Sequence, residues 1–261
     1  FLTQVHSQDF AALSDGMVRK VDIHISTFLG NEKRNYYGNI APDTLGVVWK
    51  CHLGSGITNI SSRKGDRIWS GMGWTGQPLV VSEDGTVYLI AGAFDHRLKK
   101  IDALDGTVVW EYSFDDVIKG TGTIWINKQA RTLEESVVIL QGSRRGMGNF
   151  LYSRAVPSLR AVSYFSGSEL WRFNIWRTRS FSRDMDGSPL VIGRYAFAGL
   201  ENGYFVKLNP FPSAALAKKG KRYPPLISKH KMYTEKDAQS HGGDLVIEAS
   251  YICRIRACLW I

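Results

Sequence analysis

Short stretches in which apolar and polar residues alternate run along the chain, and glycine-containing turns separate them. In the clearest stretch, residues 98–114 (LKKIDALDGTVVWEYSF), the alternation reaches a turn closed by Gly106, and a β-branched run then leads to Trp110. This pattern predicts a β-hairpin. Residues 159–175 (LRAVSYFSGSELWRFNI) repeat it, with Trp171 again four positions after the turn glycine. Repeats at a spacing of roughly 50 to 60 residues predict a propeller or a similar array before any other architecture.

The predicted strands group into units of four. The first unit has strands at 77–81, 86–91, 97–102 and 107–113, the second at 122–127, 136–141, 159–164 and 168–174, and the third begins with 187–192, 195–199 and 204–208. Four antiparallel strands joined by tight turns make one propeller blade. The sequence therefore predicts an all-β fold, a β-propeller of four-stranded antiparallel blades. The small number of units predicts a partial or truncated propeller.

Two regions fit this pattern less well. Residues 45–53 (LGVVWKCHL) are a partial copy of the hairpin and predict a strand that carries Trp49, followed by a Ser/Gly-rich loop at 54–65. After Pro210 the pattern gives way to a basic, proline-containing insertion. We expect one propeller domain over residues 1–261, divided into a partial blade at about 17–70, blades at about 74–114, 120–175 and 185–233, and the start of a further blade at 241–261.

Composition and charge narrow the function classes. With 261 residues, 44% of them hydrophobic, the chain is long enough to bury a core. No run approaches the about 18 apolar residues of a transmembrane helix, so no transmembrane segment is expected. The net charge of +9 is spread along the chain. Its one dense run, residues 218–222, has no interleaved aromatic residues, so no nucleic-acid partner is expected. The 3 cysteines and 6 histidines lack metal-ligand spacing, and we expect neither a metal site nor a bound cofactor.

Several features of the units point to one repeat family. Asp102, Gly106 and Trp110 share one hairpin, and the first strands of two units open with QPLV and SPLV. In these features the units resemble the repeats of the pyrroloquinoline-quinone-like (quinoprotein alcohol dehydrogenase-like) β-propeller family. The sequences GWTGQP, DDVIKGTG and SRDMDGSP are similar to those of propellers from the cell envelopes of Bacteroidetes-type bacteria. The resemblance covers roughly residues 45–210. It implies a propeller fold and a periplasmic or cell-envelope location.

In such a propeller the segment that leads into each first strand lies near the central axis, where several blades converge, and loops there are free to carry function. Three of these segments are polar, and their convergence predicts a funnel lined with both charge signs. The ligand-binding candidates at this axis funnel are Trp74, Gln77, Asp116, Lys119, Thr121, Arg183, Asp184 and Asp186. The alternative is a structural network in which the charges pair with one another and with backbone groups. For the two aspartates 184 and 186 we expect salt bridges to Arg183 or Arg179.

The sequence offers no catalytic motif. Gly71, Gly73 and Gly76 spell GxGxxG, but Pro78 and a β-branched run follow where a dinucleotide site needs a helix. The sequence therefore favours a non-enzymatic binding or scaffold propeller of the bacterial cell envelope, which recognises a protein or glycan partner at the axis funnel or at loop insertions. Two alternatives stay open. One is a calcium-dependent quinoprotein dehydrogenase, which the family resemblance implies but whose vicinal cysteine pair is missing here. The other is a lyase or hydrolase that uses carboxylates at the axis.

Overall fold

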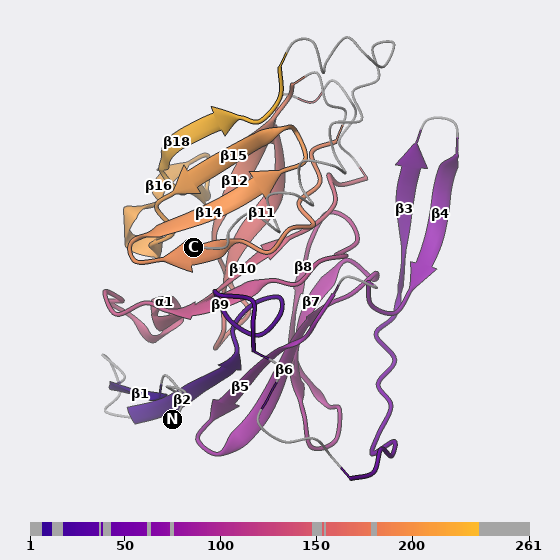
Figure 1. Cartoon of the computed structure of the whole chain (residues 1–261), viewed down its shortest axis with the longest axis vertical. Helices are drawn as coiled ribbons and strands as arrows, with labels where there is room; N and C mark the ends of the chain where they lie inside the picture. Colours follow the sequence, from indigo (N-terminus) through magenta and orange to yellow (C-terminus); the bar gives the residue numbers. More distant parts are fainter. Residues whose placement is uncertain are drawn as a thin grey trace.

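The computed structural model describes residues 7–11, 18–36, 38, 43–61, 64–73, 76–147, 153, 155–178 and 182–234. Regular structure in these residues is almost entirely β-strand, and Figure 1 shows the strands gathered into three larger sheets and two separate hairpins. All strand pairings within them are antiparallel. None of the described helices is long and apolar enough to cross a membrane.

The first sheet has the spatial order β1-β2-β5-β6-β7-β8. Its strands are β1 (Ser7–Ala11), β2 (Val18–Ile25), β5 (Leu79–Glu83), β6 (Thr86–Gly92), β7 (Arg97–Asp102) and β8 (Val108–Ser113). The last four are consecutive in the chain and form the four-stranded meander that the sequence predicts. Strand β2 pairs with β5 and so extends this meander along the edge of its first strand.

The second and third sheets have four strands each. The second contains β9 (Thr123–Ile126), β10 (Val137–Gly142), β11 (Ala155–Ser163) and β12 (Glu169–Trp176), with the short helix α1 (Leu133–Ser136) before β10. The third contains β13 (Leu190–Ile192), β14 (Tyr195–Leu200), β15 (Tyr204–Leu208) and β18 (Leu226–Lys231). The hairpins are β3 (Ser55–Ser61) with β4 (Gly65–Ser70), and β16 (Leu216–Lys218) with β17 (Lys221–Tyr223); the 3-10 helix η1 (Pro212–Ala214) precedes β16.

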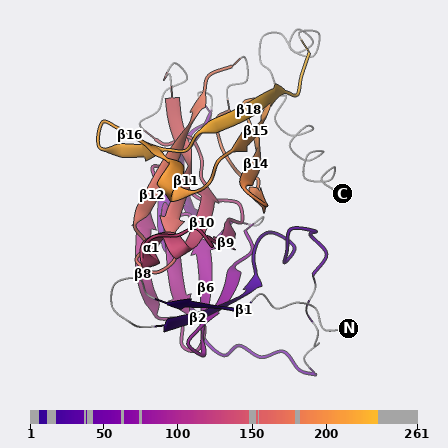
Figure 2. The ribbon, with the colours of Figure 1, turned by 90° about the vertical axis from the view of Figure 1, so that its left-hand side faces the viewer.

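The middle sheet packs against both of its neighbours, because the side chains of β10 alternate between two cores. Val137 and Ile139 belong to a buried cluster shared with the first sheet, whereas Val138 and Leu140 belong to a cluster shared with the third. All four side chains are fully buried. Successive side chains of a strand point to opposite faces, so a strand that is apolar at every position is buried on both sides. The turned view in Figure 2 shows the strands of the middle sheet among those of the other two.

Consecutive four-stranded antiparallel sheets that pack face to face are the blades of a propeller. The fold class predicted from the sequence, an all-β partial propeller of four-stranded antiparallel blades, is confirmed. Most strand positions are also correct. The strand at 97–102 has the predicted limits, and the other strands of the first two blades differ from theirs by a few residues.

Two predictions about single segments are wrong. Residues 45–53 form no strand. The side chain of Trp49 is bonded to the first sheet, while Leu45 and Val48 are 92% and 88% exposed. The predicted loop at 54–65 contains most of hairpin β3–β4, whose strands pair from Ser55 with Ser70 onwards. After Pro210, the end of the basic insertion supplies β18, the fourth strand of the third sheet.

Candidate functional site

The segments that lead into the first strands of the three blades approach one another through their backbones. A Cβ atom on Gly73 would lie 2.3 Å from the carbonyl oxygen of Lys119, and a Cβ atom on Gly120 would lie 1.9 Å from the carbonyl oxygen of Asp186. A side chain larger than hydrogen has no room at either position, which is a common reason for glycine where two backbones meet. The predicted convergence of these segments is therefore present in the structure.

Hydrogen bonds join the same segments. The backbone N–H of Gln77 donates to Thr121 Oγ1 at 2.7 Å, and Ser188 Oγ donates to the Thr121 carbonyl oxygen at 2.7 Å. The Gln77 side chain accepts a bond of 2.9 Å from the backbone N–H of Leu29. The structure thus brings Gln77 and Thr121 together as predicted. Trp74, the aromatic candidate, lies outside the described residues.

Three of the predicted charged residues meet in one buried network. Lys119 Nζ lies 2.5 Å from Asp186 Oδ2 and 3.7 Å from Asp184 Oδ2. Asp184 also accepts a bond of 2.8 Å from Arg144 Nε and one of 3.0 Å from the backbone N–H of Arg145. The expected salt bridge from these aspartates to Arg183 is not the one formed, because Lys119 and Arg144 are the cations that reach the carboxylates; Arg179 lies outside the described residues.

The other two charged candidates bind backbone groups. Asp116 is buried and accepts hydrogen bonds from the backbone N–H groups of Val117, at 2.8 Å, and Gly146, at 3.3 Å. The guanidinium of Arg183, a residue only 1% exposed, donates to the carbonyl oxygen of Ser153. These two side chains satisfy buried backbone groups, as in the structural alternative considered for the axis.

Glu201 adds a third carboxyl to the network. Burial raises the pKa of Glu201 well above its ordinary value, and the nearby carboxylates of Asp186 and Asp184 raise it further. Burial also raises the pKa of Asp186, although Lys119 opposes that shift. For Asp184 burial acts in the same direction, but Arg144 and Lys119 outweigh it and hold the pKa below its ordinary value. Burial and the neighbouring charges together therefore favour the ionised form of Asp184 and the protonated form of Glu201.

Sequence reasoning missed two members of this network, Arg144 and Glu201. Both follow the second strand of a blade, since β10 ends at Gly142 and β14 ends at Leu200. In an antiparallel meander the second strand ends at the side of the sheet where the first strand begins. The residues after each second strand therefore share a side with the polar segments before each first strand, and this rule applied to the predicted strands would have found both.

The network also reaches the β3–β4 hairpin. Arg144 Nη1 donates to Thr58 Oγ1 at 2.6 Å, and Arg145 Nη2 donates to Asn59 Oδ1 at 3.3 Å. Thr58 is fully buried although β3 lies outside the three blades. Chemically, this site holds opposite charges in fixed places next to Glu201, a carboxyl whose pKa is raised. Within the described part of the chain, no three His, Cys, Asp or Glu side chains are arranged to hold a metal ion.

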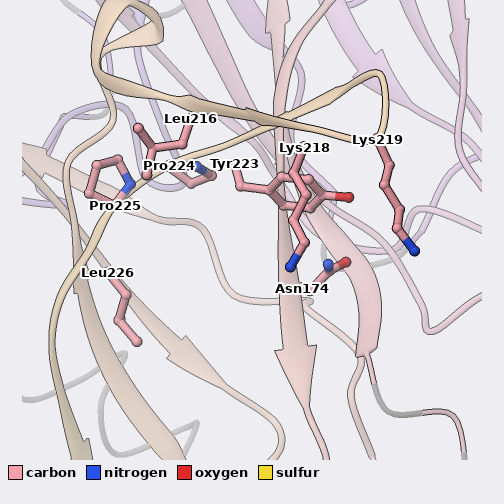
Figure 3. Close-up of a pocket in the computed structure, with 8 residues that line it drawn as sticks. All are labelled: Asn174, Leu216, Lys218, Lys219, Tyr223, Pro224, Pro225 and Leu226. Carbon is pink, nitrogen blue, oxygen red and sulfur yellow. The ribbon is translucent and has the colours of Figure 1, made fainter.

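A second candidate site lies on the outer side of the second blade, where hairpin β16–β17 packs next to β12. The hairpin and β12 enclose a groove of about 470 Å³ (Figure 3). Its polar lining comes from Asn174, Lys218, Lys219 and Tyr223, and its apolar lining from Leu216, Pro224, Pro225 and Leu226. The sequence marks this region only as a basic run.

Together, the sheets and the axis define an incomplete β-propeller with a buried charge network at the convergence of its blades. No protein-family model matches the chain, and no curated protein sequence is significantly similar to it. Among solved structures, it is similar to a quinohemoprotein alcohol dehydrogenase from Pseudomonas putida, with 16% identity over 76% of this chain and 26% of that one, at a TM-score of 0.44.

Two further solved structures are similar to parts of the chain. The computationally designed Ika8 protein has 11% identity over 64% of this chain and 43% of its own, at a TM-score of 0.36. BamB from Moraxella catarrhalis has 15% identity over 59% of this chain and 56% of its own, at a TM-score of 0.31. The chain spans less than two thirds of the length of each of the three. The fold assignment rests on the sheets of the chain itself.

Proposed function

We propose that this chain is a non-enzymatic binding or scaffold β-propeller of the bacterial cell envelope, which recognises a protein or glycan partner at its loop insertions or at the axis funnel. The observation that carries the proposal is the pairing of the axis charges. Lys119 Nζ lies within 3.7 Å of a carboxylate oxygen of both Asp184 and Asp186, and Arg144 binds Asp184 as well. A catalytic base needs a lone pair that faces substrate, and side chains that neutralise each other meet that need poorly.

The insertions offer the accessible surface that a binding protein needs. Leu45 and Val48 precede Trp49 and are almost fully exposed, and Ile68 of the β3–β4 hairpin is 70% exposed. Figure 1 shows this hairpin to one side of the three sheets. Exposed apolar side chains outside the core are typical of interaction sites, and these insertions carry them in two places. We therefore assign the partner to the insertions first and to the axis second.

At the axis, the proposed ligand contacts are the side chains that keep some exposure. Lys119 and Asp186 are each 16% exposed at their side chains, whereas Asp116 and Arg183 are buried against backbone groups. A small polar ligand at this place would exchange bonds with Lys119 and Asp186. We propose the axis as a secondary site for that reason, within a single propeller domain. Residues 241–261, where the sequence predicts the start of a further blade, lie outside the described residues.

One observation favours a second candidate, a lyase or hydrolase. The pKa of Glu201 is raised beside the carboxyl of Asp186, and a carboxyl pair with shifted pKa values is the kind that general acid–base catalysis uses. In addition, Asp186 Oδ1 is buried without a hydrogen-bond partner. Against this candidate, Lys119 is already bound to Asp186, so this cation is not free to position a substrate.

The decisive experiment measures retention and turnover side by side. The purified chain is sedimented with bacterial envelope fragments that are untreated, digested with proteinase K, or oxidised with periodate. We expect saturable retention that one of the two treatments abolishes, which identifies the partner as protein or glycan. In parallel, pyrroloquinoline quinone and calcium are added and dye-linked oxidation of alcohols and sugars is followed. Absence of retention, or turnover with the quinone, would overturn the proposal.

A further inference from the structure

The hairpin β16–β17 is an addition to the third blade rather than one of its strands. Strands β15 and β18 are hydrogen-bonded neighbours, yet residues 209–225 separate them in the chain. The hairpin leaves its own blade and packs next to β12 of the second blade. Insertions of this kind on a rigid sheet scaffold are where binding residues commonly lie.

The turn of this hairpin keeps a lysine where another residue would fit better. Lys218 pairs with Lys221, so the loop consists of Lys219 and Gly220 alone. Both residues have positive φ, 51° for Lys219 and 71° for Gly220, as a type I′ turn requires. Asn, Asp and Gly adopt this conformation at least cost, and lysine gains nothing from it locally. A side chain held at a conformational cost is often one that contacts a ligand.

The two lysines at the groove carry charge that the protein does not neutralise. Among the described residues, the side chains of Lys218 and Lys219 have no ion-pair or hydrogen-bond partner, and no acidic side chain lines the groove. Arg222 of the same basic run differs, because it donates to the Pro212 carbonyl oxygen at 2.6 Å and lies 3.7 Å from Glu135. Figure 3 shows both lysine side chains leaving the hairpin on the side where Asn174 lies.

The other walls of the groove indicate what kind of anion fits. Tyr223 offers an aromatic ring and a hydroxyl, and Asn174 offers an amide that donates and accepts. The wall after β17 is Pro224 and Pro225, and proline has no N–H to donate. An extended peptide therefore receives no backbone N–H hydrogen bonds from this wall. A sugar ring, in contrast, can stack on the ring of Tyr223 and place its hydroxyl groups next to the Asn174 amide.

From these features we infer that the groove between hairpin β16–β17 and β12 binds a carboxylate-bearing saccharide, such as a uronic acid unit of an acidic glycan. The volume of about 470 Å³ lies in the range of small-ligand sites, roughly 300–1,000 Å³. The ammonium groups of Lys218 and Lys219 bind the carboxylate, and Tyr223 and Asn174 bind the ring. This inference rests on the proposed function, since it names a glycan as the partner and an insertion as its site.

The test is calorimetric titration of the full chain with tri-galacturonic acid. The comparison ligands are its methyl ester, which keeps the sugar rings and removes the charge, and a hexaglutamate peptide. We expect saturable binding of the acid, binding of the ester at least about tenfold weaker, and no binding of the peptide. A tenfold change is about 1.4 kcal/mol. Equal binding of acid and ester, tighter binding of the peptide, or no binding of the acid would each overturn the inference.

Variants locate the site. Lys219→Asn removes the charge but keeps a residue that tolerates positive φ, and Lys218→Gln removes the neighbouring charge from a regular strand position. Each should weaken binding about tenfold. Lys221→Gln is the matched control, because this lysine belongs to the same hairpin but does not line the groove. An equal loss in the control would show non-specific attraction. If envelope fragments are retained but the uronate is not bound, the inference fails while the proposed function stands.

Discussion

The indole Nε1 of Trp110 donates a hydrogen bond of 2.9 Å to the carbonyl oxygen of Tyr164, which belongs to the next blade. The other two tryptophans in the same sequence register do the same. Trp49 donates to Ala103 and Trp171 donates to Pro210, each at 2.9 Å. The tryptophan of each outer strand thus forms a hydrogen bond to the outer turn of the next blade. In the case of Trp49, the segment 45–53 takes the place of an outer strand. The repeat seen in the sequence is a repeated junction between units.

The glycine in the receiving turn should be essential to this junction. A Cβ on Gly167 would lie 2.8 Å from the Trp110 ring, and its φ is 72°. We predict that Gly167→Ala lowers the free energy of unfolding by about 3 kcal/mol, through strain of about 1 kcal/mol and overpacking of about 2 kcal/mol. Gly193→Ala is the control, since Gly193 has φ 58° and open space around its Cβ position. Urea titration measures both, and an equal loss in the two variants would exclude a role of the tryptophan contact.

The three tryptophan junctions should differ in strength because they differ in burial. Trp171 is fully buried, whereas Trp49 lies on a segment that forms no strand and is partly exposed. We predict that Trp171→Phe costs about 3 kcal/mol, from the lost hydrogen bond and the cavity left by the smaller ring. Trp49→Phe should cost about 1 kcal/mol or less. Thermal unfolding followed by circular dichroism ranks them, and the reverse order would mean that the segment 45–53 contributes more to the fold than its exposure indicates.

Protonation of Glu201 should make stability depend on pH. Its pKa is raised in the folded state, so between the ordinary glutamate pKa and the folded value the folded protein binds a proton that the unfolded chain does not. Stability therefore falls as the pH rises through that window and levels off above it. Glu201→Gln should remove this slope and be more stable than the unchanged protein at alkaline pH. The test is the urea midpoint of unfolding, measured from pH 5 to pH 9. Measurements spaced by about one pH unit resolve the titration of a single group.

The matched control for that measurement is Glu32→Gln, because Glu32 is exposed. It should leave the slope as it is. A slope that persists in Glu201→Gln would assign the pH dependence to another group, with Asp186 the first to examine because its pKa is raised too.

Removal of Lys119 alone should lower the free energy of unfolding more than removal of the charges of both Lys119 and Asp186. Lys119→Met leaves Asp186 without its cation in a buried place, and we predict a loss of about 3 kcal/mol. The double variant Lys119→Met with Asp186→Asn should recover a large part of this loss, because no uncompensated charge stays buried. A double-mutant cycle in urea gives the coupling. Additive losses would mean that Lys119 and Asp186 contribute to stability independently. The description of the axis charges as one coupled network would then be wrong.

The sequence predicts the blades well because their signals are local. The strand at 97–102 and the turn at Gly106 follow from alternation and from a residue that tolerates positive φ, and both depend only on near neighbours. Residues 45–53 carry the same alternation but form no strand. A strand needs a hydrogen-bonded partner, and no local pattern shows whether one is present.

The axis was predicted in part for a related reason. Lys119 and Asp186 could be placed near the axis because they lie before first strands, whose positions the sequence marks. Their partners Arg144 and Glu201 follow second strands, so finding them requires one further step, which is to follow the chain from each first strand to the end of the second. The groove at β16–β17 depends on a hairpin from one blade packing on another, and that long-range contact has no signal in a single sequence.

The placement of β10 between two cores has a consequence for how the chain unfolds. In a linear array each unit contacts only its neighbours, and end units can open alone. Here Ile139 and Leu140, adjacent in one strand, anchor different cores. Opening of the middle blade exposes both cores at once, so its amide hydrogens should exchange with solvent only in the global unfolding event. The slowest-exchanging amides of the whole protein are expected in this single strand.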